Sequence, residues 1–133
     1  MGVKFEGQLR RMFKFTGALF GLIAVSAGAF GAHTLERLNP RADVEVFETA
    51  VRYQMWHALA LLVIASALPE SKLVRASGSL FVAGTLMFSG SLYALALGAP
   101  SWVGPVTPLG GLALIGGWCL TCVAALQESN ARA

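Results

Sequence analysis

The sequence predicts an all-α, polytopic membrane protein, with four transmembrane helices in an up-down-up-down bundle. Hydrophobic residues make up 56% of the 133 residues and charged residues only 13%, whereas a soluble domain carries about 25% charged residues. The apolar residues form four runs, and a hydrocarbon core about 30 Å thick needs roughly 20 helical residues to cross it. The connections between the runs are short, so helices that follow one another in sequence are expected to be neighbours in space.

The four-helix transmembrane domain is expected at residues 15–126. Its spans are predicted at about 15–33, 50–68, 77–97 and 108–126. Residues 1–14 are expected to form a basic cytoplasmic N-terminal segment, and residues 127–133 a cytoplasmic tail. Charged residues, Pro or Gly bound each apolar run, so the four runs are separate spans.

Capping and proline signals predict where these helices begin and end. Asn39-Pro40 fits an N-cap followed by Pro at the first helical position, so the second helix is expected to begin near Pro40, outside the membrane. Leu68-Pro69 ends that helix, because the residue before Pro avoids the helical region. Gly98-Ala99-Pro100 ends the third helix. Thr107-Pro108 repeats the cap signal for the fourth.

The distribution of Lys and Arg predicts the orientation in the membrane. Seven of these residues fall on one side of the four spans: Lys4, Arg10, Arg11, Lys14, Lys72, Arg75 and Arg132. On the other side three Arg residues are offset by four acidic residues, and the loop from Gly98 to Pro105 carries no charge. Both termini are therefore predicted to be cytoplasmic.

Two alternatives concern targeting. The first run could be a cleaved signal peptide, since Ala27-Gly28-Ala29 has the A-x-A form, although the apolar run is longer than a typical signal sequence. The expected location is a bacterial inner membrane, because no transit sequence is recognisable. The basic N-terminus leaves the mitochondrial inner membrane as the alternative.

Glycines recur at spacings that let transmembrane helices approach closely. In the first span Gly17 and Gly21 are four residues apart, and Gly28 follows seven residues later on the same face. The fourth span adds Gly110, Gly111, Gly116 and Gly117. This pattern predicts packing between the first and fourth helices. The alternative is that Gly is simply frequent in membrane helices.

Polar side chains are expected to converge in the outer half of the bundle. On the second helix they recur three and four residues apart, which places them on one face, and an acid four residues before an Arg favours an ion pair. Polar residues of the other three spans reach the same depth. We call the whole set the outer polar cluster: His33, Glu48, Arg52, Tyr53, Gln54, His57, Ser89, Tyr93 and Thr107.

Two interpretations of this cluster are open. Polar groups at membrane depth often mark function, so it could form a pocket for a metal, a quinone-like molecule or a lipid headgroup. It could equally be a hydrogen-bond network that locks the helices together, and this interpretation is favoured. A metal site is disfavoured, because two His supply two ligands where a structural zinc takes four. No metal and no cofactor are predicted.

Motifs for catalysis or redox chemistry are weak. Cys119 and Cys122 form a C-x-x-C in the inner half of a span without a nearby cation, so they are interpreted as buried packing residues. The sequence shows no Ser-His-Asp set, phosphate loop or H-E-x-x-H motif. An enzyme that uses His33 or His57 as acid or base is the least favoured class, since no activated nucleophile accompanies them.

Four stretches resemble the signatures of the YgdD/YwdK-like family: Gly28–His33, Phe47–Leu62, Gly84–Tyr93 and Thr107–Gly111. This is a bacterial family of small membrane proteins of unknown function, with a similar mitochondrial relative in animals. The resemblance covers about residues 15–126 and implies a four-span fold with no assigned activity. Its motif positions coincide with most of the outer polar cluster, although Thr34 stands where Gly often follows the first motif.

The predicted function is that of a small structural or accessory membrane protein. The alternative is a protein that binds a small ligand or a lipid headgroup, or a small transporter, with a pocket lined by Gln54, His57 and Tyr93. Its partners are expected to be the lipid bilayer and either further copies of itself or a larger membrane complex. Nucleic acid is excluded, because the basic residues lie in short segments between apolar runs and form no basic face.

Overall fold

The computed structural model describes residues 2–132, with side chains for residues 7–128. Within this range the elements are α1 (Gly2–Phe30), a π-helical turn η1 (Gly31–Leu35), α2 (Glu36–Leu38), α3 (Val44–Ala67), α4 (Lys72–Ala96), a 3-10 turn η2 (Ser101–Val103) and α5 (Val106–Arg132). The prediction of an all-α protein is therefore confirmed. Lys4 and Arg132, which were counted for the orientation, lie outside the residues with described side chains, and residues 1 and 133 of the predicted terminal segments lie outside the description altogether.

Three helical stretches among the described residues are long and apolar enough to cross a membrane. They are Gly7–Leu38, Lys72–Ala96 and Ser101–Glu128. The helix α3 has 24 residues but is not among these stretches; Arg52, Gln54 and His57 interrupt its middle. It packs against α1 on one side and α4 on the other, as α4 packs between α3 and α5.

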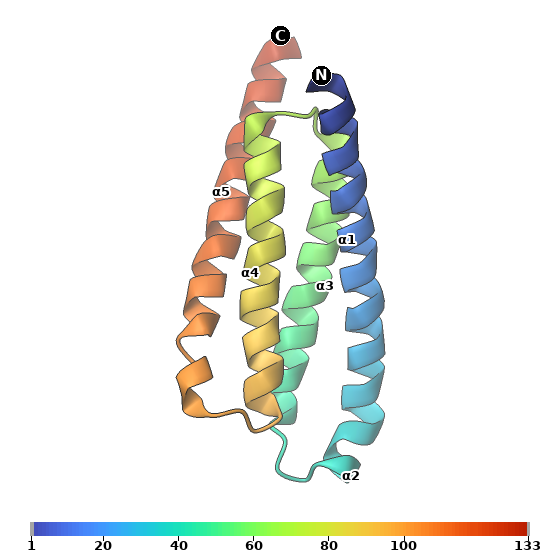
Figure 1. Cartoon of the computed structure of the whole chain (residues 1–133), viewed down its shortest axis with the longest axis vertical. Coiled ribbons are helices and arrows are strands. Elements are labelled where there is room, and N and C mark those ends of the chain that lie inside the picture. The colour runs from blue at the N-terminus through green and yellow to red at the C-terminus, as the bar shows by residue number, and fades with distance from the viewer. Residues whose placement is uncertain (1, 133) are drawn as a thin grey trace.

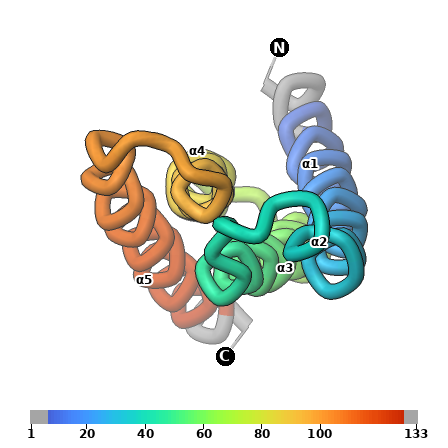
Figure 2. Tube along the Cα trace, turned by 90° about the horizontal axis from the view of Figure 1, so that it is seen from below, coloured from blue at the N-terminus to red at the C-terminus, as the bar shows by residue number. Residues whose placement is uncertain are grey.

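The four long helices alternate in direction and stand in an open row (Figures 1 and 2). The helix α1 packs on α3, α3 packs on α4, and α4 packs on α5. Seen along the helices, α1 and α5 lie at opposite ends of this row (Figure 2). Both chain termini lie at one end of the molecule, and α2 and the connection from α4 to α5 lie at the other (Figure 1). We call the latter the loop end.

The predicted start of the second helix near Pro40 is wrong. The helix α3 begins at Val44, and its N-cap is Asp43, whose side chain accepts a hydrogen bond of 3.0 Å from the backbone N–H of Val46. Asn39 instead accepts a bond of 3.3 Å from the backbone N–H two residues later, which closes a local turn. The helix ends at Ala67, directly before the predicted Leu68-Pro69 stop.

The other boundaries differ less from prediction. The helix α1 begins at Gly2, so most of the predicted basic segment is helical rather than a separate arm. The helix α4 begins after Ser71, whose hydroxyl caps its first turn. It ends near Gly98, which has a φ of 96° that favours glycine. The helix α5 begins at Val106, two residues before Pro108, and the Thr107 hydroxyl does not cap it but bonds to α4.

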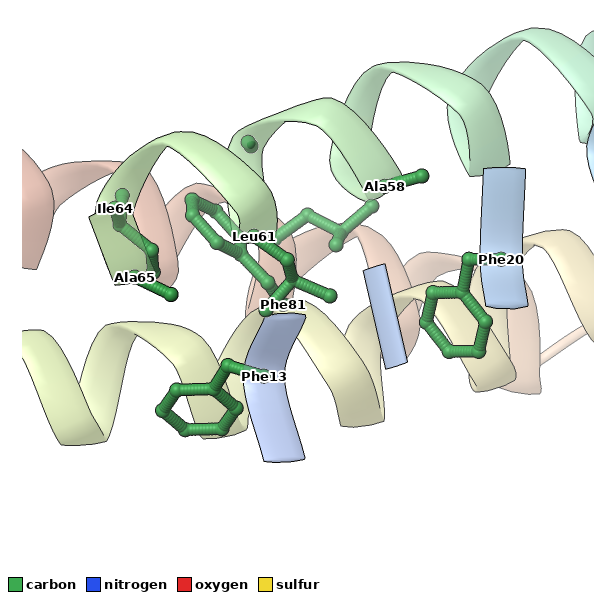
Figure 3. Close-up of a cluster of buried hydrophobic side chains, with 9 residues drawn as sticks. Phe13, Phe20, Ala58, Leu61, Ile64, Ala65 and Phe81 are labelled. Atoms are coloured by element: carbon green, nitrogen blue, oxygen red, sulfur yellow. The ribbon is translucent and has the colours of Figure 1, made fainter. Parts of the chain in front are cut away.

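The main hydrophobic core lies between α1, α3 and α4 and reaches α5 (Figure 3). Its buried members are Phe13, Phe20, Ala58, Ala60, Leu61, Ile64, Ala65, Phe81 and Leu114. A smaller cluster nearer the loop end contains Leu35, Phe47 and Ala96. These two clusters fix α3 against both of its neighbours along its whole length.

Glycines set the closest helix contacts, but not between the helices expected. A Cβ on Gly17 would lie 2.9 Å from the backbone oxygen of Ala58, so α1 touches the backbone of α3. A Cβ on Gly110 would lie 2.9 Å from Met87 Cβ and from Phe88 Cα, so α5 touches the backbone of α4. The predicted pairing of the first and fourth helices is therefore wrong, because each packs on its neighbour in sequence.

The remaining predicted glycines make looser contacts, with one exception. The distances from an added Cβ to the nearest atom are 3.9 Å at Gly21, 3.3 Å at Gly28, 3.6 Å at Gly111, 3.4 Å at Gly116 and 2.6 Å at Gly117. At Gly117 the neighbour is the ring of Phe81 in the core. Gly84 was not predicted, yet the side chain of Leu114 occupies the space where its Cβ would stand.

Candidate functional site

The outer polar cluster does not form one site. His33 and Glu48 line an open pocket at the loop end, between η1 and the start of α3. Gln54 is directed at α1, whereas His57 is directed at α5. The two His residues therefore do not share a cavity. A common depth in the membrane does not bring side chains together when they lie on different faces of their helices.

His57 is buried and bonded at both ring nitrogens. Its Nδ1 lies 2.8 Å from the backbone oxygen of Tyr53, one turn earlier in α3. Its Nε2 lies 3.1 Å from the indole Nε1 of Trp118 on α5. The ring also contacts Phe81 of α4, with centroids 5.4 Å apart. His57 thus links the three helices that follow α1.

These two bonds fix the tautomer of His57. An indole N–H can only donate, so Nε2 must accept the bond from Trp118. A backbone oxygen can only accept, so Nδ1 must carry the hydrogen that it donates to Tyr53. His57 is therefore the neutral Nδ1–H tautomer, and both of its polar atoms are satisfied. A ring in this state offers no free nitrogen to a metal or to a substrate.

A cavity of about 500 Å³ opens beside this bridge, between α3 and α5. We call it the aromatic cleft, because five of its lining residues carry rings: Tyr53, Trp56, His57, Phe88 and Trp118. Gly111, Leu114 and Ile115 complete the lining. Ligand pockets typically have volumes of about 300–1,000 Å³ and are lined mainly by apolar and aromatic side chains, and this cleft matches that description.

The cleft continues along α3 into a second, aliphatic cavity of about 360 Å³. Trp56 and Trp118 border both cavities. Beyond them the lining is formed by small and aliphatic residues of α3 and α5: Leu59, Ala60, Val63, Ile64, Ala67, Leu68, Thr121 and Ala125. The groove between α3 and α5 therefore has an aromatic part and an aliphatic part.

Several other polar side chains tie the helices to one another. Gln54 donates a 2.9 Å bond to the backbone oxygen of Phe20, which joins α3 to α1. Ser77 donates to the backbone oxygen of Gly117, at 2.8 Å, and its hydroxyl lies 2.7 Å from that of Thr121. These bonds are buried between α4 and α5, where an unpaired polar group would be costly. The side chains of Gln54, Ser77 and Thr121 thus hold neighbouring helices together.

Ser89 and Tyr93 do not line the aromatic cleft. The Tyr93 ring packs on Phe47, with centroids 4.9 Å apart, near the loop end of α3 and α4. The hydroxyls of Ser89 and Tyr93 are buried without a hydrogen-bond partner among the described residues. The predicted pocket lined by Gln54, His57 and Tyr93 is therefore wrong, because these three side chains point to different neighbours.

The expected ion pair between Glu48 and Arg52 is also not formed. Arg52 instead donates to the hydroxyl of Thr49, at 3.2 Å, and to the backbone oxygen of Glu48, at 3.4 Å. Thr107 lies at the start of α5, and its hydroxyl is 2.7 Å from that of Ser91. Arg52 therefore bonds within its own helix and Thr107 bonds to α4, and neither residue lines the aromatic cleft.

The interpretation of the two cysteines as buried is wrong. Cys119 and Cys122 are both exposed. The helix α5 faces α4 through Leu114, Gly117 and Thr121, and the cysteines lie on other sides of the helix. Because α5 has only one extensively packed neighbour, these sides face outward from the row.

Sequence reasoning missed two residues that matter here. Trp118 donates the hydrogen bond to His57. Its position could have been noticed in the sequence, because Trp in membrane proteins is enriched at the interfaces, whereas Trp118 lies in the middle of α5. Arg10 on α1 donates from Nε to the backbone oxygen of Ala65, at 3.0 Å, near the carboxyl end of α3. A cation there satisfies carbonyls that have no helical partner.

Comparisons with known proteins place the chain among membrane proteins without an assigned activity. Residues 27–111 match a family model described as a protein of unknown function (DUF423). The UPF0382 membrane protein YwdK of Bacillus subtilis (strain 168) is 43% identical over 120 residues, which cover 88% of this chain and 98% of the relative. No solved structure matches the chain.

Two further relatives come from other bacteria. The UPF0382 inner membrane protein YgdD of Escherichia coli (strain K12) is 38% identical over 119 residues, which cover 88% of this chain and 91% of the relative. A UPF0382 membrane protein of Haemophilus influenzae is 42% identical over 102 residues, which cover 76% and 82%. The resemblance expected from the four motif stretches is thus confirmed.

Proposed function

The chain belongs to the DUF423 family of UPF0382 membrane proteins, and on this premise we propose that it binds a membrane-soluble molecule in the aromatic cleft. It is a multi-pass protein of the inner membrane. The observation that carries the proposal is the cleft itself, a preformed cavity of about 500 Å³ whose only buried titratable residue, His57, is already bonded on both sides. This arrangement favours binding over catalysis.

We further propose that the protein spans the membrane four times, with both termini in the cytoplasm. Three helices meet the requirements for a span. The helix α3 runs the length of its neighbours, and its polar residues Gln54 and His57 are buried and bonded to α1 and α5. Both chain ends lie at the same end of the molecule (Figure 1). Fusions of a reporter that fluoresces only in the cytoplasm to either terminus test this topology, and a dark C-terminal fusion would contradict it.

The lining of the groove indicates the chemistry of the ligand. Flat rings stack well between aromatic side chains, and the aliphatic cavity beyond Trp56 and Trp118 suits an apolar tail. The Tyr53 hydroxyl and the Trp56 indole N–H have no hydrogen-bond partner among the described residues, so both remain available to donate to an oxygen. The ligand class that fits is a ring-bearing lipid with carbonyl oxygens, such as a prenylated quinone.

The test uses the tryptophans as reporters. Purified protein in mild detergent is titrated with a short-chain prenylated benzoquinone, and the quenching of tryptophan fluorescence is followed. We expect saturable quenching, because Trp56 and Trp118 border the cleft. Trp102 is exposed outside it, so a Trp102→Phe variant should retain the saturable quenching.

A filled cleft gives the decisive comparison. In Gly111→Leu the new Cβ fits at 3.6 Å from the Phe88 ring, and the rest of the side chain extends from the cleft lining. The matched control is Gly90→Leu on α4, where an added Cβ has no atom within 4 Å. Quenching that is weakened at least tenfold in Gly111→Leu but not in Gly90→Leu supports the proposal. Equal quenching in both variants contradicts it.

A second candidate function, that of a structural accessory protein, is favoured by one observation. Gln54, Ser77 and Ser91 use their polar groups between helices. The same titration separates the two functions. A cleft that binds neither the quinone nor any lipid extracted with the protein favours the structural role.

A further inference from the structure

A separate cavity, of about 310 Å³, lies at the loop end, on the side of the molecule formed by α1 and α3. It is lined by His33 and Thr34 of the π-helical turn η1, by Glu36 and Arg37 of α2, and by Glu48 of α3. Single π-helical turns are rare and occur often at functional sites. We call this cavity the polar pocket.

The three charged side chains of the polar pocket are exposed. Among the described residues, the side chains of Glu36, Arg37 and Glu48 make no ion pair and no hydrogen bond. The pocket therefore presents two carboxylates and one guanidinium to its contents. Carboxylates accept hydrogen bonds from an ammonium group, and a guanidinium binds a phosphate with two parallel bonds.

An apolar groove of about 200 Å³ continues from the polar pocket along α1 and α3. Gly31 and Glu48 border both spaces. The groove is lined further by Gly28, Phe47, Val51 and Arg52. Gly28 of α1 and Gly31 of η1 carry no side chain, so their backbone lies close to α3: an added Cβ would stand 3.3 Å from Val51 and 3.1 Å from the ring of Phe47. A charged pocket at the end of the helices thus opens into an apolar groove that runs toward their middle.

We propose that this combined site binds a phospholipid whose headgroup carries a primary ammonium next to the phosphate. The ammonium lies between Glu36 and Glu48, the phosphate is bound by Arg37, and the start of an acyl chain lies in the groove beside Gly28 and Val51. Two carboxylates, Glu36 and Glu48, and two guanidinium groups, Arg37 and Arg52, line the combined site. These balanced charges complement a zwitterionic headgroup better than an anionic one, which offers the carboxylates no positive charge. The site is independent of the aromatic cleft, which lies between α3 and α5.

The experiment is native mass spectrometry of the detergent-purified protein with added lipids of identical acyl chains. Phosphatidylethanolamine and phosphatidylcholine have the same net charge, but only the ethanolamine headgroup has N–H donors for the carboxylates. We expect bound phosphatidylethanolamine to exceed bound phosphatidylcholine roughly two- to fivefold, as for exposed charge pairs. Equal binding of the two lipids, or preferred binding of phosphatidylglycerol, overturns the proposal without any variant.

Matched variants locate the site. Glu48→Gln removes one carboxylate of the pocket, whereas Glu45→Gln removes an exposed carboxylate of the same helix that does not line it. Arg37→Gln and Arg41→Gln form the corresponding pair of basic residues. We expect the preference for phosphatidylethanolamine over phosphatidylcholine to fall roughly two- to fivefold in Glu48→Gln. Arg37→Gln should lower the binding of both lipids by a similar factor, because both carry the phosphate, and the two control variants should change neither quantity. Equal losses in the control variants would show that the surface charge of the loop end, rather than this pocket, selects the lipid.

Discussion

The contact between α4 and α5 at Gly110 gives the most direct test of the packing. In Gly110→Ala the added Cβ would lie 2.9 Å from both Met87 Cβ and Phe88 Cα and closer still to the backbone nitrogen of Phe88, whereas ordinary contacts lie at 3.4–4 Å. The helices must therefore separate by about 0.5–1 Å, and gaps of this size forfeit about a quarter to a half of the dispersion energy of the atoms involved. The atoms in the way are mostly backbone, so a side-chain rotation cannot relieve the overlap.

The magnitude follows from two opposing terms. Overpacking a tight contact costs about 1–3 kcal/mol, while replacing Gly by Ala in a helix gains up to about 1 kcal/mol. The expected net loss for Gly110→Ala is up to about 2 kcal/mol. Gly111→Ala makes the same change of residue one position later, where the new Cβ fits at 3.6 Å from the Phe88 ring. It should leave the free energy of unfolding unchanged or raise it slightly.

The assay is reversible unfolding in mixed micelles of mild detergent and dodecyl sulfate, followed by tryptophan fluorescence. Trp118 reports on α5 because its indole bonds to His57 on α3. The midpoint for Gly110→Ala should fall below that of the original protein, and the midpoint for Gly111→Ala should not. If the two variants unfold at the same midpoint, α4 and α5 do not meet at Gly110 and the packing described above is incorrect.

Three further predictions concern single hydrogen bonds. Gln54→Leu removes the bond from α3 to α1 and should lower the free energy of unfolding by about 0.6 kcal/mol, as for membrane side-chain bonds in general; an unchanged midpoint in mixed micelles would argue against that bond. Trp118→Phe leaves Nε2 of His57 without its donor, so nitrogen NMR should show a single Nδ1–H tautomer in the original protein and a mixture in the variant, with a stability loss of about 1–3 kcal/mol. Arg10→Gln should speed amide exchange in the last turn of α3 and cost about 0.3–1 kcal/mol, whereas Arg11→Gln, at an exposed position, should do neither.

The positions of the long helices were predictable from the sequence, but the residue at which α3 begins was not. Asn39 and Asp43 are both good N-caps and lie four residues apart, so the local sequence does not choose between them. In the structure the N-cap is Asp43. Its backbone N–H donates a 3.0 Å bond to the backbone oxygen of Ala96 at the end of α4. This tertiary bond holds Asp43 next to α4, and it has no signature in the sequence around Pro40.

The candidate site was predicted less well, for a geometric reason. The sequence gives the depth of a residue along a helix reliably, and it gives the facing direction only when the neighbours are known. Gln54 and His57 were placed on one stripe, yet one bonds to α1 and the other to α5. The same uncertainty placed Cys119 inside the bundle, because a closed ring would have given α5 two packed neighbours instead of one.

The open row has a consequence for how the protein is made. Each long helix packs mainly on its neighbours in the chain, so most of the native contacts close only short loops, which keeps the entropic barrier to folding low. A helix that emerges from the ribosome already has its partner in the membrane, and no late step has to bring α1 and α5 together. The chain can therefore assemble progressively during synthesis, from its N-terminus onward.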